Sequence, residues 1–171
     1  MTVGGRCVGI VLNGEIRRGE APTAIQRLSV AAERCATRTV VIGKMPGGSV
    51  YDALAIGTAL RAADYATVAL AGSQCHSACG LVYLGGVHRY WQDRARFMIH
   101  RPVIYDSFPS LTAEIAAYED LKERLIRYAT DMGGNPDYVD AMYAVPSGQV
   151  AEVTSALRTA WSLSTTGGVP F

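Results

Sequence analysis

The stretch GSQCHSACGLVYLGG, from Gly72 to Gly86, decides how the rest of the chain is interpreted. It follows YATVALAG (65–72), an apolar run of strand length, and it gathers small residues around a serine, a histidine and two cysteines. Small residues let a backbone turn approach a sheet closely. Three interpretations fit: a nucleophile at the start of a helix, a metal site, or a small-residue helix packed tightly in a core.

On both sides of this stretch, short apolar runs alternate along the chain with segments of helical periodicity. Such alternation is typical of an α/β fold with a mostly parallel sheet. No repeat or linker divides the chain, so we expect a single domain over residues 1–171. The tail from Asn135 shows short helical signals and no clear strand. The expected strands are 6–16, 37–45, 65–72 and 94–102, and the expected helices are 21–36, 50–64, 73–86 and 111–132.

Three chemically conspicuous features fall where expected strands end. MPGGSV (45–50) follows the second strand, GSQCHSAC (72–79) follows the third, and His100 ends the fourth. Because ligands of open α/β sheets bind outside the carboxyl ends of the strands, we expect these features to meet at one edge.

The residue types at this edge suit nucleophilic catalysis. A serine hydroxyl needs a base to take its proton and donors to hold the developing oxyanion. Ser77 is the candidate nucleophile, and the N–H of Ala78, with those of Gly47 and Gly48, would bind the oxyanion. His100 is the candidate base, because the adjacent His76 points elsewhere around the expected helix and His88 lies beyond its far end.

The cysteines leave alternatives open. Cys75 and Cys79 are spaced to share a helix face, which suits zinc, but His76 faces elsewhere and no second pair follows. A Cys75–Cys79 disulfide requires a distorted helix start. Two buried thiols that pack as small apolar groups are the simplest interpretation. We therefore expect no metal and no cofactor.

Composition narrows the function classes. The net charge is +1 and basic residues form no stripe, which disfavours nucleic acid as a partner. The apolar runs are too short to span a bilayer, and the N-terminus lacks the pattern of a signal peptide. Four cysteines are too few for a disulfide scaffold at this length. A reduced, cytoplasmic chain is the default expectation, with an exported or membrane-associated form left open.

The segment KMPGGSVYDALAIGTALRAAD (44–64), the CHSAC motif (75–79) and RFMIHRP (96–102) together resemble the Clp protease proteolytic subunit and its crotonase-like relatives. The likeness runs from about Gly9 to Asp140. It is strongest to bacterial Clp-protease-like proteins with a C-x-S-A-C motif. It implies a crotonase-like spiral of β-β-α units, and a long handle helix at about 111–132 that packs between subunits of an oligomer.

The resemblance also implies roles for individual residues. The Pro46-Gly47-Gly48 turn would supply an oxyanion N–H, Ser77 would be the nucleophile, and His100 in its M-I-H-x-P block would be the base. The family places an aspartate after the handle helix. Here the matching region is DYVDAMYAVPSGQ (137–149), in which Asp140 is the nearest acid.

These observations together predict a serine-type peptidase that cleaves extended peptides, with Ser77, His100 and Asp140 or with a Ser–His dyad. Two alternatives remain: an acyl-CoA-type crotonase relative that needs no serine, and a degenerate oligomeric binding module. The sequence leaves open whether an ATPase partner docks.

Overall fold

The computed structural model describes residues 2–3 and 6–165. Its main sheet has the strand order β3-β4-β5-β7-β8, with β6 also paired to β5. All pairs in this sheet are parallel except the antiparallel β7–β8. A separate antiparallel pair forms from β1 and β2. The strands are β1 (Thr2–Val3), β2 (Arg6–Cys7), β3 (Ile10–Leu12), β4 (Thr39–Met45), β5 (Ala66–His76), β6 (Arg89–Trp91), β7 (Arg96–Ile99) and β8 (Ala151–Glu152).

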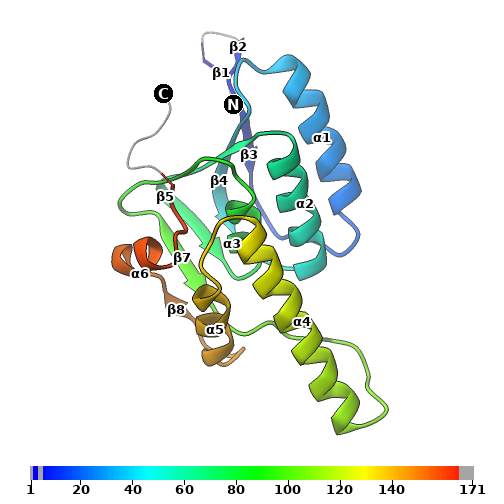
Figure 1. The fold of residues 1–171 in the computed structure, drawn as a ribbon. Coiled ribbons are helices and arrows are strands. Elements are labelled where there is room, and N and C mark those ends of the chain that lie inside the picture. Colours follow the sequence, from blue (N-terminus) through cyan, green and yellow to red (C-terminus); the bar gives the residue numbers. More distant parts are fainter. Residues whose placement is uncertain (1, 4–5, 166–171) are drawn as a thin grey trace.

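Helices cover the sheet and leave the start of the longest one extending outward. Figure 1 shows α1, α2 and α4 on one side of the sheet, with α5 and α6 near β7 and β8. The first turns of α4 reach beyond the rest of the molecule (Figure 1). The helices are α1 (Ala21–Arg34), α2 (Val50–Ala62), α3 (Cys79–Leu84), α4 (Leu111–Asp131), α5 (Asp137–Ala144) and α6 (Ser155–Ala160).

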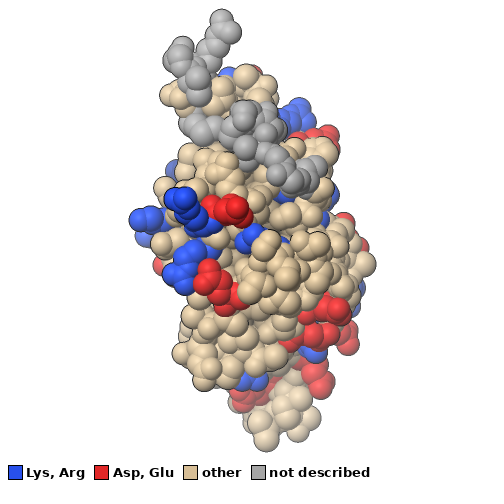
Figure 2. Space-filling model, turned by 90° about the vertical axis from the view of Figure 1, so that its left-hand side faces the viewer, with Lys and Arg blue, Asp and Glu red and all other residues tan. Residues whose placement is uncertain are grey.

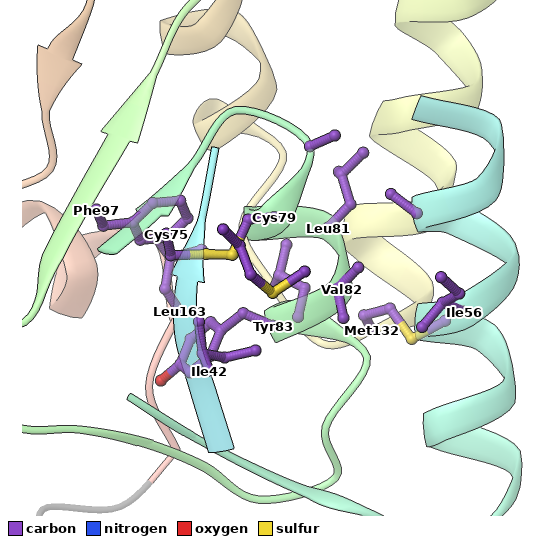
Figure 3. Packing of buried hydrophobic residues seen from close by; sticks show 14 of the residues in the cluster. Ile42, Ile56, Cys75, Cys79, Leu81, Val82, Tyr83, Phe97, Met132 and Leu163 are labelled. Carbon is purple, nitrogen blue, oxygen red and sulfur yellow. A yellow bond between two sulfur atoms is a disulfide. The ribbon is translucent and has the colours of Figure 1, made fainter. Parts of the chain in front are cut away.

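The short helix α3 lies at the centre of the core, where all six of its residues are buried. The hydroxyl of Tyr128 on α4 donates to the carbonyl of Leu81 on α3 at 2.7 Å, which fastens the second half of α4 to this core. Figure 3 shows residues of α3 packed beside Phe97 and Met132. The α/β fold with a mostly parallel sheet and one long helix is confirmed.

The predicted helix at 73–86 is wrong in its first part. Strand β5 continues through Ser73–His76, and the helix begins only at Cys79. The reason is tertiary: Thr67–Ala69 of β5 pair with β6, whereas Gln74–His76 pair with β7. A second partner therefore keeps the chain extended where its small residues suggested a helix.

Three short strand pairings are not predicted from the sequence. These are the β1–β2 pair, β6, and β8, which lies in the tail where no strand was expected. Each contains only two or three residues, too few to show alternation.

The expectation of reduced thiols is also wrong. Cys7 is bonded to Cys35 and Cys75 to Cys79, which leaves no free cysteine. The second bond is possible because Cys75 ends a strand rather than lying within a helix, so the Cα atoms lie 5.3 Å apart. It also removes the zinc alternative, because a bonded sulfur cannot serve as a thiolate ligand.

The surface carries charges of both signs. Figure 2 shows basic and acidic side chains interspersed over one face, with uncharged areas between them. None of the described helices combines the length and apolarity needed to cross a bilayer.

Candidate active site

The register of the sheet brings the three expected features together. Met45 pairs with Cys75, and His76 pairs with Met98, so β4, β5 and β7 end at neighbouring positions. The residues that follow these ends are Pro46-Gly47-Gly48, Ser77 and His100. The predicted convergence is therefore present in the backbone before any side chain is considered.

Ser77 occupies a turn between β5 and α3 with a left-handed backbone. Its φ is +53°, a conformation that is uncommon and strained for a residue with a side chain. The N–H of Ser77 donates to the carbonyl of Met98 at 2.8 Å, and its own carbonyl accepts from Gly80 at 3.0 Å. This arrangement fixes a sharp corner, with the serine at the cavity described below.

Gly47 lies against this corner so closely that only glycine fits. A Cβ atom at Gly47 would lie 2.8 Å from the Cβ of Ser77 and 3.2 Å from the N of Ala78. The φ of Gly47 is +100°, which side-chain-bearing residues rarely adopt. The turn therefore needs glycine for both its conformation and its approach to Ser77.

A backbone bridge fixes the position of the glycine turn. The N–H of Ile16 donates to Gly47, and the N–H of Ser49 donates to Ile16, both at 2.7 Å. Gly48 is opposite Ile16 in this parallel bridge, where a Cβ would overlap the carbonyl of Ile16. This role of Ile16 could not be predicted, because a backbone pairing leaves no residue-type pattern.

The backbone amides at this corner are available as donors. Within residues 2–3 and 6–165, the N–H groups of Gly47, Gly48 and Ala78 donate to no protein acceptor. Gly47 and Ala78 are buried, and native proteins pair most buried amides, so the unpaired amides of these two residues beside a serine suit a bound oxyanion.

His100 follows β7 and is half-buried. Its Nδ1 lies 2.9 Å from the carbonyl oxygen of Arg101. The contact requires a proton on Nδ1, and it leaves Nε2 as the basic nitrogen of the neutral ring. The described contacts include no hydrogen bond between the Ser77 hydroxyl and His100. Catalytic hydrogen bonds are often long before substrate binds.

A second histidine lies close by. Burial, then electrostatic interactions with Arg96 and His100, lower the pKa of His76, against a smaller opposing effect of Glu152. Its Nε2 is buried without a partner among the described residues. His76 is therefore held neutral beside the site.

Ser77 and His100 line the same cavity, of about 530 Å³. The rest of its lining comes from Glu15–Arg18, from Pro46 and Gly48–Tyr51, from Pro102–Asp106, and from Leu121 of α4. Two of these lining residues, Arg18 and Asp106, form an ion pair with 3.8 Å between the charged atoms. The sequence had not singled out these charged residues, because isolated charges in loops carry no periodicity.

Asp140 lies on α5 with its carboxylate 2.7 Å from the Nζ of Lys122. Over the described chain, no hydrogen bond or ion pair joins Asp140 to His100. The structure thus brings together Ser77, His100, the glycine turn and Ala78, and it gives Asp140 another partner.

Comparisons with known proteins agree with this geometry. A family model described as Clp protease matches residues 6–139. Among solved structures, an Asn-to-Asp mutant of ClpP1 from Listeria monocytogenes matches with a TM-score of 0.67 and 16% identity, over 91% of this chain and 88% of that one. No curated protein matches significantly. The fold is thus that of ClpP1, and the chain belongs to the Clp protease family.

Proposed function

We propose that this protein is a serine-type peptidase in which Ser77 is the nucleophile and His100 the general base. The convergence of Ser77, His100 and Gly48 at one cavity carries the proposal. Membership in the Clp protease family supports peptidase chemistry in general terms.

The reaction follows from the positions of these groups. Ser77 Oγ attacks the carbonyl carbon of the peptide while His100 Nε2 takes its proton. The N–H of Ala78 and of Gly47 or Gly48 stabilises the resulting oxyanion. His100 then protonates the leaving amine, and water releases the acyl group from Ser77 by the reverse sequence of proton transfers.

The carbonyl of Arg101 takes the orienting role that a carboxylate has in a full triad. It holds the proton of His100 on Nδ1, which keeps Nε2 basic and directed away from that contact. A neutral carbonyl stabilises the imidazolium less than a carboxylate does, so this dyad would be slower than a triad. Asp140 is left as a surface partner of Lys122.

The substrate in this proposal is an extended peptide. Two segments of the cavity lining, 46–49 and 102–106, are irregular stretches that follow the parallel strands β4 and β7. An extended chain could add between them by backbone hydrogen bonding, with side chains directed alternately into and out of the cavity.

We further propose that the protein works as a homo-oligomer in an oxidising compartment. The exposed apolar side chains at the start of α4 support the first part. Both disulfides support the second, because thiols are normally kept reduced in the cytosol. This replaces the cytoplasmic default.

Hydrolysis of a fluorogenic peptide mixture tests the peptidase proposal. Ser77→Ala and His100→Ala should each lower kcat/KM by about a thousandfold or more. The matched controls Ser29→Ala and His88→Ala change exposed residues of the same types, and their activity should equal that of the wild type.

The alternatives predict different outcomes. Activity that survives Ser77→Ala would favour the acyl-CoA-type relative, which needs only the oxyanion donors. A wild-type protein that is folded and inactive on all peptides and esters would favour the binding module.

A further inference from the structure

The Cys75–Cys79 disulfide brackets the proposed nucleophile. Cys75 is two residues before Ser77 at the end of β5, and Cys79 is two residues after it at the start of α3. Figure 3 shows the bond in the core, with Phe97 beside Cys75. Both cysteines are fully buried. The bond therefore closes a small covalent ring around the catalytic corner.

Besides the backbone hydrogen bonds that Ser77 makes with Met98 and Gly80, few local features hold the shape of this corner. Ser77 is left-handed at φ +53°, and Ala78, the residue before α3, provides no side-chain cap. Helix α3 has only six residues, far below the length at which a helix is stable alone. A strained serine followed by an uncapped short helix requires support from its surroundings.

The two ends of the ring are firmly placed. Cys75 lies in register between Met45 of β4 and Phe97 of β7. At the other end, Gly80 fits so tightly against Phe97 and Tyr138 that a Cβ there would overlap both side chains. The disulfide thus ties a fixed strand to a fixed helix start, and only His76, Ser77 and Ala78 lie between them.

This geometry matters for the oxyanion donors. Ala78 contributes an N–H from within the ring, and Gly47 lies against both the Cβ of Ser77 and the N of Ala78. A shift of the corner by one ångström would separate the nucleophile from these donors, and errors of that size cost large factors in rate.

We propose that Cys75 and Cys79 are positioning residues whose disulfide holds Ser77 and the Ala78 N–H in the reactive arrangement. This inference rests on the proposed peptidase function. Reduction by a dithiol or a phosphine, which supplies two electrons while two protons come from the reductant or from solvent, would break the S–S bond, give two thiols and lower the reactivity of Ser77 while the fold persists.

The second disulfide provides a matched control. Cys7 and Cys35 join β2 to the residue after α1, 28 positions apart in the chain and outside the cavity lining. The variant Cys7→Ala/Cys35→Ala retains only the bond at the corner. The variant Cys75→Ala/Cys79→Ala retains only the remote bond.

The kinetics of each variant are measured in its oxidised form and in its reduced form, which is refolded in phosphine. Circular dichroism verifies the fold of each sample. For Cys7→Ala/Cys35→Ala, reduction should lower kcat tenfold or more with KM changed less than threefold, and reoxidation should restore it. Cys75→Ala/Cys79→Ala should be equally slow before and after reduction. In the same samples, amide hydrogen exchange over residues 73–84 should accelerate at least tenfold when the corner bond is absent.

Three results would overturn the proposal. The first is a kcat that stays unchanged although thiol titration shows that both corner thiols are free. Another is unchanged exchange over 73–84, a readout that holds even if the protein has no activity. A reduced protein that cannot refold would be the third, since the bond would then maintain the whole fold. Failure of the peptidase function itself would appear separately, as an inactive oxidised wild type.

Discussion

At the scale of single residues, the contacts of His100 and Asp140 bear on the choice between a Ser–His dyad and a triad that includes Asp140. The Nδ1 of His100 already has an acceptor in the Arg101 carbonyl, and the Asp140 carboxylate already has a cation in Lys122. A triad would require both of these contacts to break. The dyad requires neither to break, which is why we propose it.

Asp140→Asn should therefore leave kcat/KM within a few-fold of the wild type. Its ion pair with Lys122 is partly exposed, so the free energy of unfolding should fall by less than about 1 kcal/mol. Kinetics and thermal melting of the purified variant measure both quantities. A fall in rate above about a hundredfold with an unchanged melting temperature would restore Asp140 as the third catalytic residue.

Gly47→Ala should reduce kcat by about a hundredfold or more, comparable to the loss of an oxyanion donor. The added methyl would meet the Cβ of Ser77 at 2.8 Å and strain a backbone with positive φ. Gly148→Ala is the matched control, because a Cβ there meets nothing within 4 Å. Equal activity of the two variants would show that the glycine turn does not form the oxyanion site.

At the scale of elements, the start of α2 is tied to the loop that forms one side of the cavity. Burial alone would raise the pKa of Asp52, but donors outweigh it and lower the pKa below 3.8. These donors are the Ser49 hydroxyl and the amides of Gly19 and Ala21. The carboxylate thereby holds the segment that contains Arg17 and Arg18 beside the site.

Asp52→Asn should lower the free energy of unfolding at pH 7 by about 2 kcal/mol, since hydrogen bonds to a charged acceptor are lost or weakened. The folded pKa is depressed, so the stabilisation is fully present above the unfolded pKa of about 3.9 and disappears as pH falls through the folded value. Urea unfolding at pH 7 and at pH 3 measures the difference. A gap between variant and wild type that stays constant over this range would contradict the assignment.

The sequence predicted the longer strands of the sheet and the helices α1, α2 and α4, and it failed where tertiary pairing decides, as at the short strands β6 and β8. The helix from Leu111 and the strand of Thr39–Met45 showed clear periodicity or β-branched composition. Ser73–His76 did not, because pairing with β7 rather than local composition keeps them extended. Strand ends were still placed well enough to predict that Ser77 and His100 converge.

The finer features of the site could not be predicted for a physical reason. The acceptor for His100 is a backbone carbonyl, which every residue has, so no residue type marks it. The bond between Cys75 and Cys79 depends on the conformation between them, and a strand-to-helix corner brings together what a continuous helix would keep apart.

At the scale of the whole molecule, the long helix divides into a half that is packed against the core and a half with exposed apolar side chains. Leu121, Leu125 and Tyr128 are buried within the chain itself. By contrast, Leu111 is 71% exposed and Ile115 is 49% exposed, on the part of α4 that reaches outward (Figure 1). The expectation that the helix at 111–132 packs between subunits therefore narrows to the first turns of the helix.

Leu111→Glu/Ile115→Glu should shift the protein from an oligomer to a monomer, because charges at an apolar contact would have to be desolvated. Light scattering after size exclusion measures the mass at micromolar concentration. Glu114→Gln on the same turns is the control and should keep the wild-type mass. A wild type that is already monomeric would contradict the proposed assembly.

The central claim is that His100 activates Ser77 within an intact oxyanion site. Intact-mass analysis after exposure to a fluorophosphonate probe tests it most directly, because the probe forms a covalent bond only with an activated serine. We expect one adduct on the oxidised wild type, none on Ser77→Ala, and labelling slowed by orders of magnitude on His100→Ala. Equal labelling of all three proteins, or none of the wild type over several hours, would contradict the claim.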